Sequence, residues 1–537
     1  MIGLAKEFNT TAVCIPELHY MVNLHSRLEE IQKMVSSGKY FTINRARQYG
    51  KTTLLRALHR YLQTDYYVIS MDFQMFDFAK FQDGHIFSIS FAKVFLKLLK
   101  KAITNNNDHL QNAILNLQKN IDTSNSNFTL QELFENLSDI CNYADKPLIL
   151  IIDEVDSATN NQVFLDFLAQ LRGYYINRDL QSTFQSVILA GVYDIKNLKM
   201  KFRTDEEHKV NSPWNIAADF NVDMSFSKED IISMLLEYEA DYQTGMNTNE
   251  LGTLLYNYTS GYPFLVSRLC KLLDEEICPK KFSGNKQLTW TKSGFQEAVK
   301  LLLNEKNTLF ESLTEKLISF PELSKILQTL LFTGKNIPYN FYESSINIAT
   351  MFGFVKNQYG NLAVANRIFD TWLYNFYLSS SEMHEKEIYK TSLQYKNQFI
   401  IDGNLNMRRI LEKFVIHFYD LYGNCNEQFL EEEGRKYFLL YLRPIINGIG
   451  NYYIESQTRD LKRTDIIIDY NGNQYIIEMK IWHGNEYNHR GEQQLISYLN
   501  DYHQTKGYMI SFNFNKKKEI GVKELIINDK VLIEATI

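Results

Sequence analysis

The segment Gly50-Lys51-Thr52-Thr53 holds residue types that can bind phosphate, and its position in the chain suits that chemistry. It follows a β-rich run, residues 40–44, and precedes a stretch with helical spacing of apolar residues, which is the order expected of a phosphate-binding loop. In such a loop the backbone N–H groups point at the phosphates, the lysine reaches the β and γ oxygens, and the next hydroxyl binds magnesium. The sequence therefore predicts a site for nucleotide phosphates at Arg47, Gln48, Tyr49, Gly50, Lys51, Thr52 and Thr53.

A second motif lies further along the chain, where an apolar run ends in Asp153 and Glu154. The run, residues 148–152, predicts a central strand of a parallel sheet, and such sheets place their ligands at the carboxyl ends of the strands. We expect Asp153 to hold magnesium together with Thr52, and Glu154 to orient or deprotonate the attacking water. Arg45 stands where the usual G-x-x-x-x-G-K-[ST] pattern has its first glycine, but the two motifs together predict binding of ATP or GTP.

Asp465, Glu478 and Lys480 form a third group, near the end of the chain. Glu478 and Lys480 are two residues apart on a predicted strand, so both project from one face, and a hairpin through Asn471-Gly472 folds the strand of Asp465 alongside. Asp465 and Glu478 can then share a hard divalent cation, Mg²⁺ or Mn²⁺, while Lys480 positions a water or balances the negative charge. These residue types predict hydrolysis of a phosphodiester.

Residues on the two neighbouring predicted helices add to this third group. Gln494 and Tyr498 lie four apart on the following helix and face the same way, where they can support the metal site or contact phosphate. Glu433, on the preceding helix, can add a third carboxylate. A Glu-x-Lys pair on a strand is by itself typical of an exposed ion pair, so the metal-dependent interpretation depends on Asp465, the hairpin and the helix together.

Several single residues could assist the nucleotide site. A polar residue after the fourth predicted strand, Tyr193 or Asp194, could sense the γ-phosphate, with an ordinary loop role as the alternative. Arg172, Arg203 and Arg268 could each supply a charge-stabilising finger in cis or in trans. The alternative for each arginine is a solvated or salt-bridged position at the surface.

The composition is that of an ordinary globular protein. The 537 residues, 45% of them hydrophobic and 22% charged, correspond to about three to four domains. A net charge of −6 means that any contact with nucleic acid must come from a local patch rather than from the field of the whole protein. The five cysteines are widely spaced, which excludes a disulfide framework or a zinc ribbon. With no secretory leader and no apolar window of about 18 residues, we expect a soluble, cytoplasmic protein without membrane contact.

The pattern of predicted elements divides the chain into five segments. Residues 1–226 alternate helices with short β-rich runs, and predict a core with a parallel sheet; the runs are residues 40–44, 67–72, 148–153, 186–192 and 221–225. A helical lid follows at 227–306, and three helices with a small hairpin predict a winged-helix-like module at 307–378. The polar stretch 379–400 predicts a linker, and residues 401–537 predict a second α/β domain.

The chain resembles a bacterial family in which an AAA-ATPase-like domain, of the archaeal or STAND-like type, is fused to a C-terminal PD-(D/E)XK nuclease-superfamily domain. The resemblance rests on residues 41–53 (FTINRARQYGKTT), 151–157 (IIDEVDS), 186–194 (SVILAGVYD), 212–217 (SPWNIA), 259–270 (TSGYPFLVSRLC), 463–465 (RTD), 477–482 (IEMKIW) and 491–498 (GEQQLISY). It implies that the residues of the first two motifs bind and hydrolyse ATP. It also implies that Asp465, Glu478 and Lys480 are the metal-binding and catalytic residues of a nuclease, supported by Gln494.

The fold class expected is therefore a multidomain α/β protein with a P-loop parallel sheet, a helical lid, a winged-helix-like module and a C-terminal α/β restriction-endonuclease-like domain. Our first hypothesis is an ATP-gated, Mg²⁺-dependent nuclease of a defence or mobile-element system, with DNA favoured over RNA as its partner and homo-oligomers open. The alternative is a signal-transducing ATPase switch whose C-terminal domain binds nucleic acid or protein without cleavage. A P-loop enzyme that acts on a small molecule is a third hypothesis, for which the remaining residues offer no substrate pocket.

Overall fold

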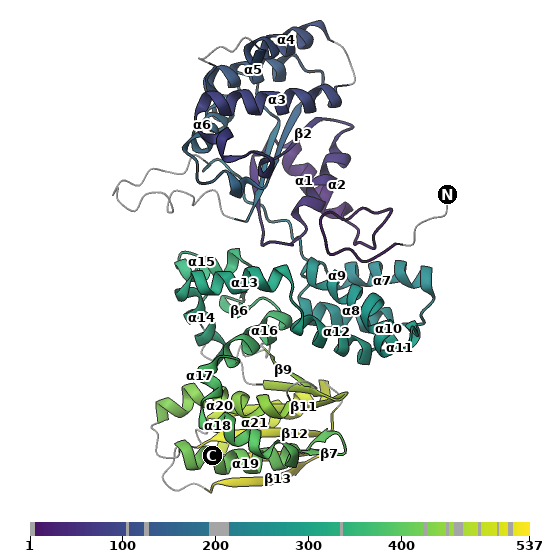
Figure 1. Ribbon diagram of the computed structural model, residues 1–537, viewed down its shortest axis with the longest axis vertical. Coiled ribbons are helices and arrows are strands. Elements are labelled where there is room, and N and C mark those ends of the chain that lie inside the picture. Colours follow the sequence, from purple (N-terminus) through teal and green to yellow (C-terminus); the bar gives the residue numbers. More distant parts are fainter. Residues whose placement is uncertain are drawn as a thin grey trace. The chain divides into compact units, whose positions relative to one another are not determined.

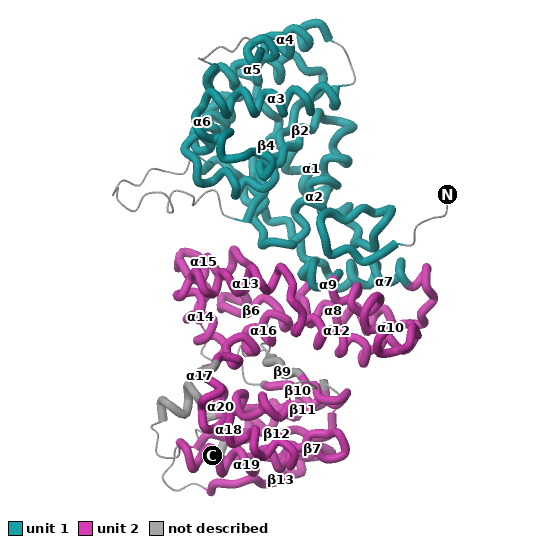
Figure 2. Tube along the Cα trace, viewed as in Figure 1, with its two compact units in different colours: residues 1–238, 262–267 teal, residues 239–261, 268–537 magenta. Residues whose placement is uncertain are grey.

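A computed structural model describes the chain at residues 6–103, 107–122, 128–192, 214–332, 337–422, 427–446, 450–455, 465–481, 485–501, 504–513 and 519–537. Within these ranges, the side chains of residues 381–382, 427–433, 451–455, 465, 481, 485–488 and 501 are not described. The chain divides into two compact units (Figure 2), Met1–Tyr238 with Tyr262–Ser267, and Glu239–Gly261 with Arg268–Ile537. No helix among the described residues is long and apolar enough to cross a membrane.

The first unit is built on a parallel sheet of four strands in the order β1-β4-β3-β2 (Figure 1). The strands are β1 Phe41–Asn44, β2 Tyr67–Asp72, β3 Leu148–Asp153 and β4 Ser186–Gly191. The helices are α1 His25–Ser36, α2 Lys51–Leu62, α3 Gly84–Ala102, α4 Asp108–Asp122, α5 Leu130–Tyr143 and α6 Gln162–Ile176, with parts of α7 Lys228–Tyr242 and α9 Pro263–Lys271. The four β-rich runs from residue 40 to residue 192 therefore form strands as predicted.

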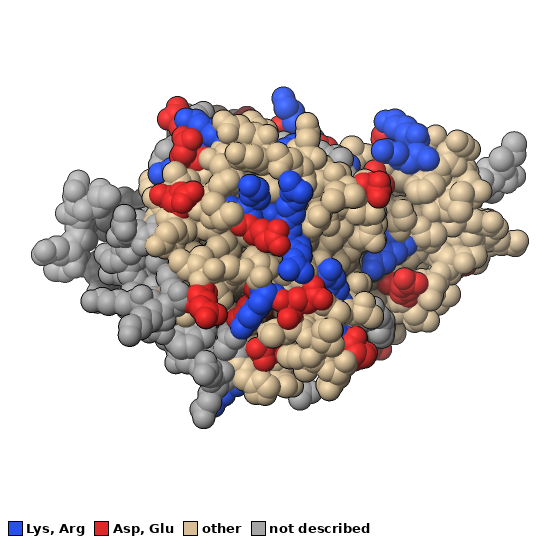
Figure 3. All heavy atoms as spheres, turned by 90° about the horizontal axis from the view of Figure 1, so that it is seen from below, with Lys and Arg blue, Asp and Glu red and all other residues tan. Residues whose placement is uncertain are grey.

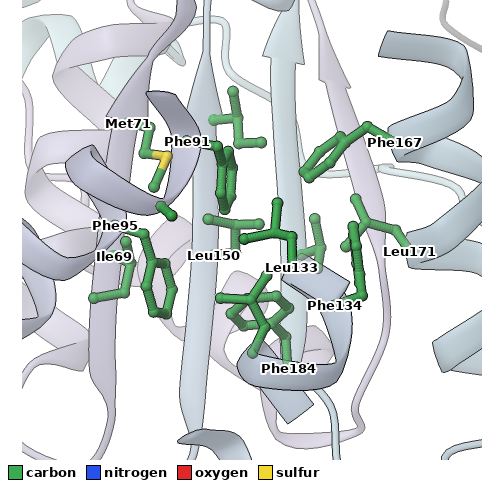
Figure 4. Packing of buried hydrophobic residues seen from close by; sticks show 14 of the residues in the cluster. Ile69, Met71, Phe91, Phe95, Leu133, Phe134, Leu150, Phe167, Leu171 and Phe184 are labelled. Atoms are coloured by element: carbon green, nitrogen blue, oxygen red, sulfur yellow. The ribbon is translucent and has the colours of Figure 1, made fainter. Parts of the chain in front are cut away.

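Helices cover both faces of this sheet because its strands are apolar on both faces. In β3, Ile149 and Ile151 pack with α1 and α2, whereas Leu150 and Ile152 pack on the opposite side with α3, α5 and α6. Figure 4 shows this second side, where aromatic rings such as Phe167 lie over the aliphatic side chains of the strands. Six consecutive buried residues in β3 place Asp153 at the carboxyl edge of a rigid sheet.

Residues 221–225, which the sequence predicts as a fifth strand, form no strand. Shortly before the segment, Ala218 forms an isolated parallel bridge with Phe41 of β1. Its carbonyl groups accept hydrogen bonds from side chains instead: Arg27 donates to the carbonyl oxygens of Asp223 (2.8 Å) and Ser225 (2.7 Å). Because these carbonyls are already bonded to a guanidinium, the segment lies against the sheet without extending its ladder.

The second unit begins with helices that correspond to the predicted lid and winged-helix-like module. The lid helices are α8 Thr248–Thr259, α10 Cys278–Lys281, α11 Lys286–Thr289 and α12 Lys292–Asn304, with a π-helical turn at Leu272–Ile277. The next elements are α13 Thr308–Ser319, α14 Pro321–Phe332, α15 Ser344–Met351, the hairpin β5 Val355–Gln358 with β6 Asn361–Val364, and α16 Arg367–Leu378. The three helices and the hairpin agree with the predicted elements, and the final helix α16 is an addition to them.

Residues 379–400, predicted as a linker, fold as helices α17 Ser381–His384 and α18 Glu387–Tyr395. One face of α18 is buried through Ile388 and Ser392, which lie four residues apart. The Ser392 hydroxyl donates a hydrogen bond to the carbonyl of Tyr441. This segment is therefore part of the C-terminal domain, because it contributes a packed helix and a buried hydrogen bond to it.

The C-terminal domain is a mixed six-stranded sheet in the order β13-β14-β12-β11-β10-β9. The strands are β9 Gly450–Glu455, β10 Asp465–Tyr470, β11 Asn473–Ile481, β12 Lys506–Phe512, β13 Gly521–Ile527 and β14 Lys530–Thr536, and a two-stranded β7 Ile400–Ile401 with β8 Asn404–Leu405 precedes them. The helices are α19 Met407–Tyr422, α20 Glu427–Ile446 and α21 Asn485–Asp501. The last two strands, β13 and β14, are additions to the predicted order of elements.

The two faces of this sheet carry different helices. Gly507 of β12 lies against Leu495 and Leu499, so α21 covers the face that Gly507 shares with Ser511. Phe512, which points to the opposite face, lies against Gly434 of α20. The helix that carries Glu433 and the helix that carries Gln494 therefore cover opposite faces of the sheet.

Candidate functional site

The loop between β1 and α2 has the backbone of an anion-binding turn. Gly50, the N-cap of α2, lies in the left-handed region at φ 80°, and Gln48 lies there as well at φ 58°. Gln48 and Gly50, which have one residue between them, are both left-handed, and this pair makes the chain turn sharply. The first N–H groups of α2 therefore face outward with no partner inside the helix. Glycine suits position 50 because of this positive φ and not because of crowding, since a Cβ there would find open space.

Lys51 is buried and its ammonium group holds this loop closed. Its Nζ donates hydrogen bonds to the carbonyl oxygens of Arg45 (2.9 Å) and Ala46 (3.1 Å). Burial lowers the pKa of Lys51 below its ordinary value, and the nearby charges of Glu154, Asp156 and Asp153 oppose that shift. A cation removed from water gains strongly from an anionic ligand, as a bound phosphate would be.

Thr52 and Asp153 meet although they come from different motifs. The Thr52 hydroxyl donates a hydrogen bond to Asp153 Oδ2 at 2.8 Å, and the backbone N–H of Glu154 donates to Asp153 Oδ1 at 2.9 Å. Burial raises the pKa of Asp153, while both hydrogen bonds and Lys51 act in the other direction. A hydroxyl and a carboxylate are hard oxygen ligands, so this pair fits a magnesium ion.

Glu154 and Asp156 follow Asp153 at the carboxyl edge of the sheet. Glu154 is half-buried in a left-handed conformation at φ 53°, and burial raises its pKa. Asp156 Oδ2 accepts a hydrogen bond of 2.6 Å from the backbone N–H of Val192, just after β4. A Cβ on Gly191 would lie 2.8 Å from Asp156 Oδ1, so a larger residue there would force the Asp156 side chain to move. Sequence reasoning missed this link between β3 and β4, although Asp156 and Gly191 both lie in the quoted motifs.

Arg45, at the position of the usual first glycine, has a structural role. Its guanidinium donates hydrogen bonds to the carbonyls of Asn44 (2.9 Å) and Val222 (3.1 Å), and lies 5.6 Å from the centre of the Phe220 ring. Arg45 therefore ties the phosphate loop to the segment that was predicted as a fifth strand. The departure from the usual glycine is explained by this contact.

Tyr262 supports the other side of the loop, within the first unit. Its hydroxyl donates a hydrogen bond of 2.6 Å to the carbonyl of Arg47, and its ring packs edge-on against Tyr49 with centroids 4.7 Å apart. The Tyr49 hydroxyl in turn lies 2.7 Å from Ser225 Oγ. Thr53 accepts a hydrogen bond of 3.2 Å from the N–H of Cys14. The contacts of these side chains hold the backbone of the loop in position.

The other arginines and polar residues proposed for the nucleotide site lie in different parts of the chain. Arg268 forms two hydrogen bonds to the carboxylate of Glu305, one of them 2.9 Å from Nε, so it is engaged in a structural ion pair. Arg172 lies on α6. Tyr193, Asp194 and Arg203 lie outside the described residues.

Of the C-terminal candidates, Glu478, Lys480 and Gln494 lie together on one face of the large sheet, whereas the helix that carries Glu433 covers the opposite face. Glu478 is fully buried, and its Oε1 lies 3.4 Å from Lys480 Nζ. Lys480 Nζ also lies 3.4 Å from Gln494 Oε1 on α21. In the antiparallel register Asp465 is the direct partner of Glu478, so the two residues share that face. The side chains of Asp465 and Glu433 are outside the description, and among the described residues no group of three acidic, histidine or cysteine side chains is placed to hold a metal ion.

Two further features of this face escaped the sequence analysis. The backbone of α21 passes directly over Lys480, because a Cβ on Gly491 would lie 2.7 Å from Cδ, Cε and Nζ of that lysine. Glu534 of β14 is also buried on this face, accepts a hydrogen bond of 3.1 Å from Ser511 and pairs with Lys523 at 2.8 Å. Gly491 lies within a quoted motif, whereas Glu534 comes from a strand that the sequence did not predict.

Basic and acidic side chains are interspersed on the face that Figure 3 shows. Within the C-terminal domain, Arg408 pairs with both Glu412 and Glu524 at 3.0 Å. Such pairs balance the local charge, so the charge pattern of this face does not by itself indicate a polyanion partner.

A parallel sheet with a phosphate-binding loop after β1 and an acidic pair at the end of β3 defines the class of P-loop nucleotide-binding proteins. A family model described as an AAA-like domain matches residues 16–337, more than half of the chain, so the chain belongs to the AAA-like domain family. This match confirms the expected relationship to AAA ATPases. It ends before the candidate nuclease residues, so it does not extend to the expected fusion.

The solved structures that are similar to this chain include a Walker-type ATPase and an Orc1 protein. The Walker-type ATPase paby2304 of Pyrococcus abyssi is 15% identical with a TM-score of 0.45, over 68% of this chain and 99% of that one. The Orc1 protein of Aeropyrum pernix, solved in complex with DNA, is 10% identical with a TM-score of 0.29, over 66% of this chain and 93% of that one. No match was found among curated proteins.

Proposed function

We propose that this protein binds and hydrolyses ATP at the loop of residues 45–53 and that its C-terminal domain is a Mg²⁺-dependent nuclease. The observation that carries the first half is the 2.8 Å hydrogen bond between Thr52 and Asp153, which joins the two nucleotide motifs. The second half is supported by the contacts of Lys480 with Glu478 and Gln494. The proposal also includes DNA as the nucleic acid and a cytoplasmic location. It further includes homo-oligomers and a role in defence or in mobile elements.

At the nucleotide site, each side chain has a separate task. Lys51 exchanges its two carbonyl partners for phosphate oxygens, and the N–H groups at the start of α2 bind the same phosphates. Thr52 and Asp153 would hold a magnesium ion, which would neutralise phosphate charge. Glu154, whose raised pKa makes it a better proton acceptor, orients the attacking water.

At the C-terminal site, the described residues supply Glu478 as a buried carboxylate and Lys480 as a cation beside it. Together with Asp465, Glu478 would hold a divalent cation that activates water. Lys480 would orient that water or offset charge on the scissile phosphate, and Gln494 would keep the lysine in position. Control of this site by the nucleotide is part of the proposal because both sites act on phosphate groups in one chain.

The ATPase half is tested with Glu154→Gln in the full chain. The variant keeps the shape of the side chain and removes the proton acceptor, so we expect ATP binding close to wild type and turnover reduced by at least about 100-fold. Glu30→Gln, an exposed position on α1, is the matched control. Equal turnover in wild type and Glu154→Gln would contradict the assigned role.

Metal binding by the C-terminal domain is tested by calorimetric titration of Mn²⁺ into the full chain without nucleotide. We expect a binding event that Asp465→Asn abolishes and that Asp420→Asn, an exposed position on α19, leaves unchanged. The same binding in the wild type and in Asp465→Asn would remove Asp465 from the metal site and would leave the ATPase half of the proposal intact.

A further inference from the structure

A cleft of about 900 Å³ lies within the second unit, among helices of the lid, the winged-helix-like module and the C-terminal domain. Its walls include residues of α12, α14, α16 and α20, and it extends to Gly450 at the start of β9. The volume is in the range of small-molecule sites, which is about 300–1,000 Å³. The nucleotide loop belongs to the first unit, so this cleft is a separate site.

The charged side chains that line this cleft are all cationic: Lys300 of α12, and Lys436 and Arg443 of α20. The described lining contains no aspartate or glutamate. Arg443 is held by neutral groups, since it donates hydrogen bonds to Asn375 Oδ1 at 2.8 Å and to the Ser379 hydroxyl. Neutral partners orient the guanidinium without cancelling its charge, so the cleft favours an anionic ligand.

Aromatic rings form the other part of the wall. Trp372 and Phe376 are one turn apart on α16 and stack with centroids 5.5 Å apart at 20°. Phe310 stacks on Trp372 at 5.2 Å and 6°, which fixes the plane of the indole. Lys436 Nζ lies 5.9 Å from the centre of the Phe332 ring, so a cation and an aromatic face occur together there. Trp372 and Phe332 are buried, whereas Phe376 and Tyr377 of α16 are half-buried and line the cleft. Half-buried rings beside cations suit a ligand with a planar base and a phosphate.

We propose that this cleft binds a nucleotide, with its phosphate at Lys300, Lys436 and Arg443 and its base against the rings of α16. The nucleotide can come from two sources, a free mononucleotide or a residue of a single strand. A strand has a structural path, because β9 runs from Gly450 in the cleft to Glu455, the register partner of Asp465. The proposal does not depend on cleavage by the C-terminal domain.

The test uses the full chain and three probes: AMP, a fluorescein-labelled dT tetranucleotide and inorganic phosphate. AMP lacks the β and γ phosphates that the P-loop lysine would hold, and each titration is repeated in Lys51→Met to exclude that site. We expect the double variant Lys300→Gln/Arg443→Gln to weaken binding of AMP or of the tetranucleotide at least tenfold. Lys325→Gln, an exposed position on α14 outside the lining, should leave it unchanged.

A second variant and a crosslink guard against misfolding of the double variant. Phe376→Leu keeps an apolar side chain and should weaken binding severalfold with an unchanged melting temperature. A tetranucleotide with 5-iodouridine should crosslink to α16, as located by mass spectrometry. Binding of AMP alone identifies a free nucleotide as the ligand, and binding of the tetranucleotide alone identifies a strand, and both support the proposal.

Three results would overturn the proposal. They are no binding of AMP or the tetranucleotide, equal binding in the wild type and in both cleft variants, and an affinity for inorganic phosphate as high as that for AMP. The last result would mean that the rings contribute nothing to the ligand.

Discussion

Replacing Lys51 with methionine separates ligand binding from folding at the nucleotide site. Methionine has nearly the same length and removes the charge, whose burial lowers the pKa of this lysine. In the free protein the variant loses two hydrogen bonds to loop carbonyls, and it also no longer buries a cation. These effects oppose each other, so we expect the melting temperature without nucleotide to change little.

The expected effect of Lys51→Met on the affinity for ATP is much larger than its effect on the stability of the free protein. A hydrogen bond to a charged group contributes about 1.5–3 kcal/mol, so two bonds to phosphate correspond to a loss of affinity of at least about 100-fold. At an ATP concentration of about 100 times the wild-type Kd, binding stabilises the wild type by about 2.7 kcal/mol and the variant by about 0.4 kcal/mol. For a domain of this size, the wild-type melting temperature should rise by roughly 5–11 °C and that of the variant by roughly 1–2 °C.

The assay is thermal unfolding of the full chain with and without Mg²⁺-ATP, following the first transition. Lys33→Met, an exposed position on α1, is the matched control and should show the wild-type rise. An equal rise in the wild type and in Lys51→Met would contradict the role assigned to Lys51, because ATP would then be held without this lysine.

Three further substitutions test other contacts. Gly491→Ala should keep the free energy of unfolding close to that of the wild type, because a gain in helix propensity of about 1 kcal/mol offsets the crowding against Lys480. The added methyl group should displace Lys480 and lower the rate of cleavage more than tenfold. Unchanged cleavage would contradict the close approach of Gly491 to Lys480. Tyr262→Phe removes the hydrogen bond to the carbonyl of Arg47 and should raise the Kd for ATP about tenfold, measured by calorimetry, and an unchanged Kd would refute the support assigned to this tyrosine. Burial raises the pKa of Asp469, so its charge costs stability once the pH exceeds the pKa of the folded state, and the cost disappears as the pH falls below the usual carboxyl range. Asp469→Asn should therefore increase the free energy of unfolding at pH 7 but not near pH 3, and a gain that is equal at both values would contradict this assignment.

The sequence predicted correctly those elements whose backbone conformation is determined by residues that are close in the chain. The strand β3 is predicted at its observed bounds, because six apolar or acidic residues in a row allow only a central strand ending in Asp153. The loop before Lys51 follows from the same kind of information. These short motifs fix the backbone and place Thr52 beside Asp153.

The structure differs from the sequence predictions where residues that are distant in the chain determine the local conformation. Residues 221–225 have the composition of a strand, but their carbonyl groups accept hydrogen bonds from Arg27 and Arg45, which lie 177 to 198 residues earlier. Helix α18 looks like a polar linker because only a narrow face is buried, and its partner Tyr441 is 49 residues away. The closeness of Gly491 to Lys480 depends on how α21 packs on the sheet, which no local pattern encodes.

The most direct test of the central claim is cleavage by the purified full chain with Mg²⁺, with and without ATP. The substrates are supercoiled and linear duplex DNA, single-stranded DNA and structured RNA, and the wild type is compared with Lys480→Ala and Lys51→Met. We expect cleavage that Lys480→Ala abolishes and that depends on ATP and on Lys51. ATP turnover without cleavage of any substrate would contradict the nuclease and favour a switch whose C-terminal domain only binds, and cleavage that is equal in Lys51→Met would contradict control by the nucleotide.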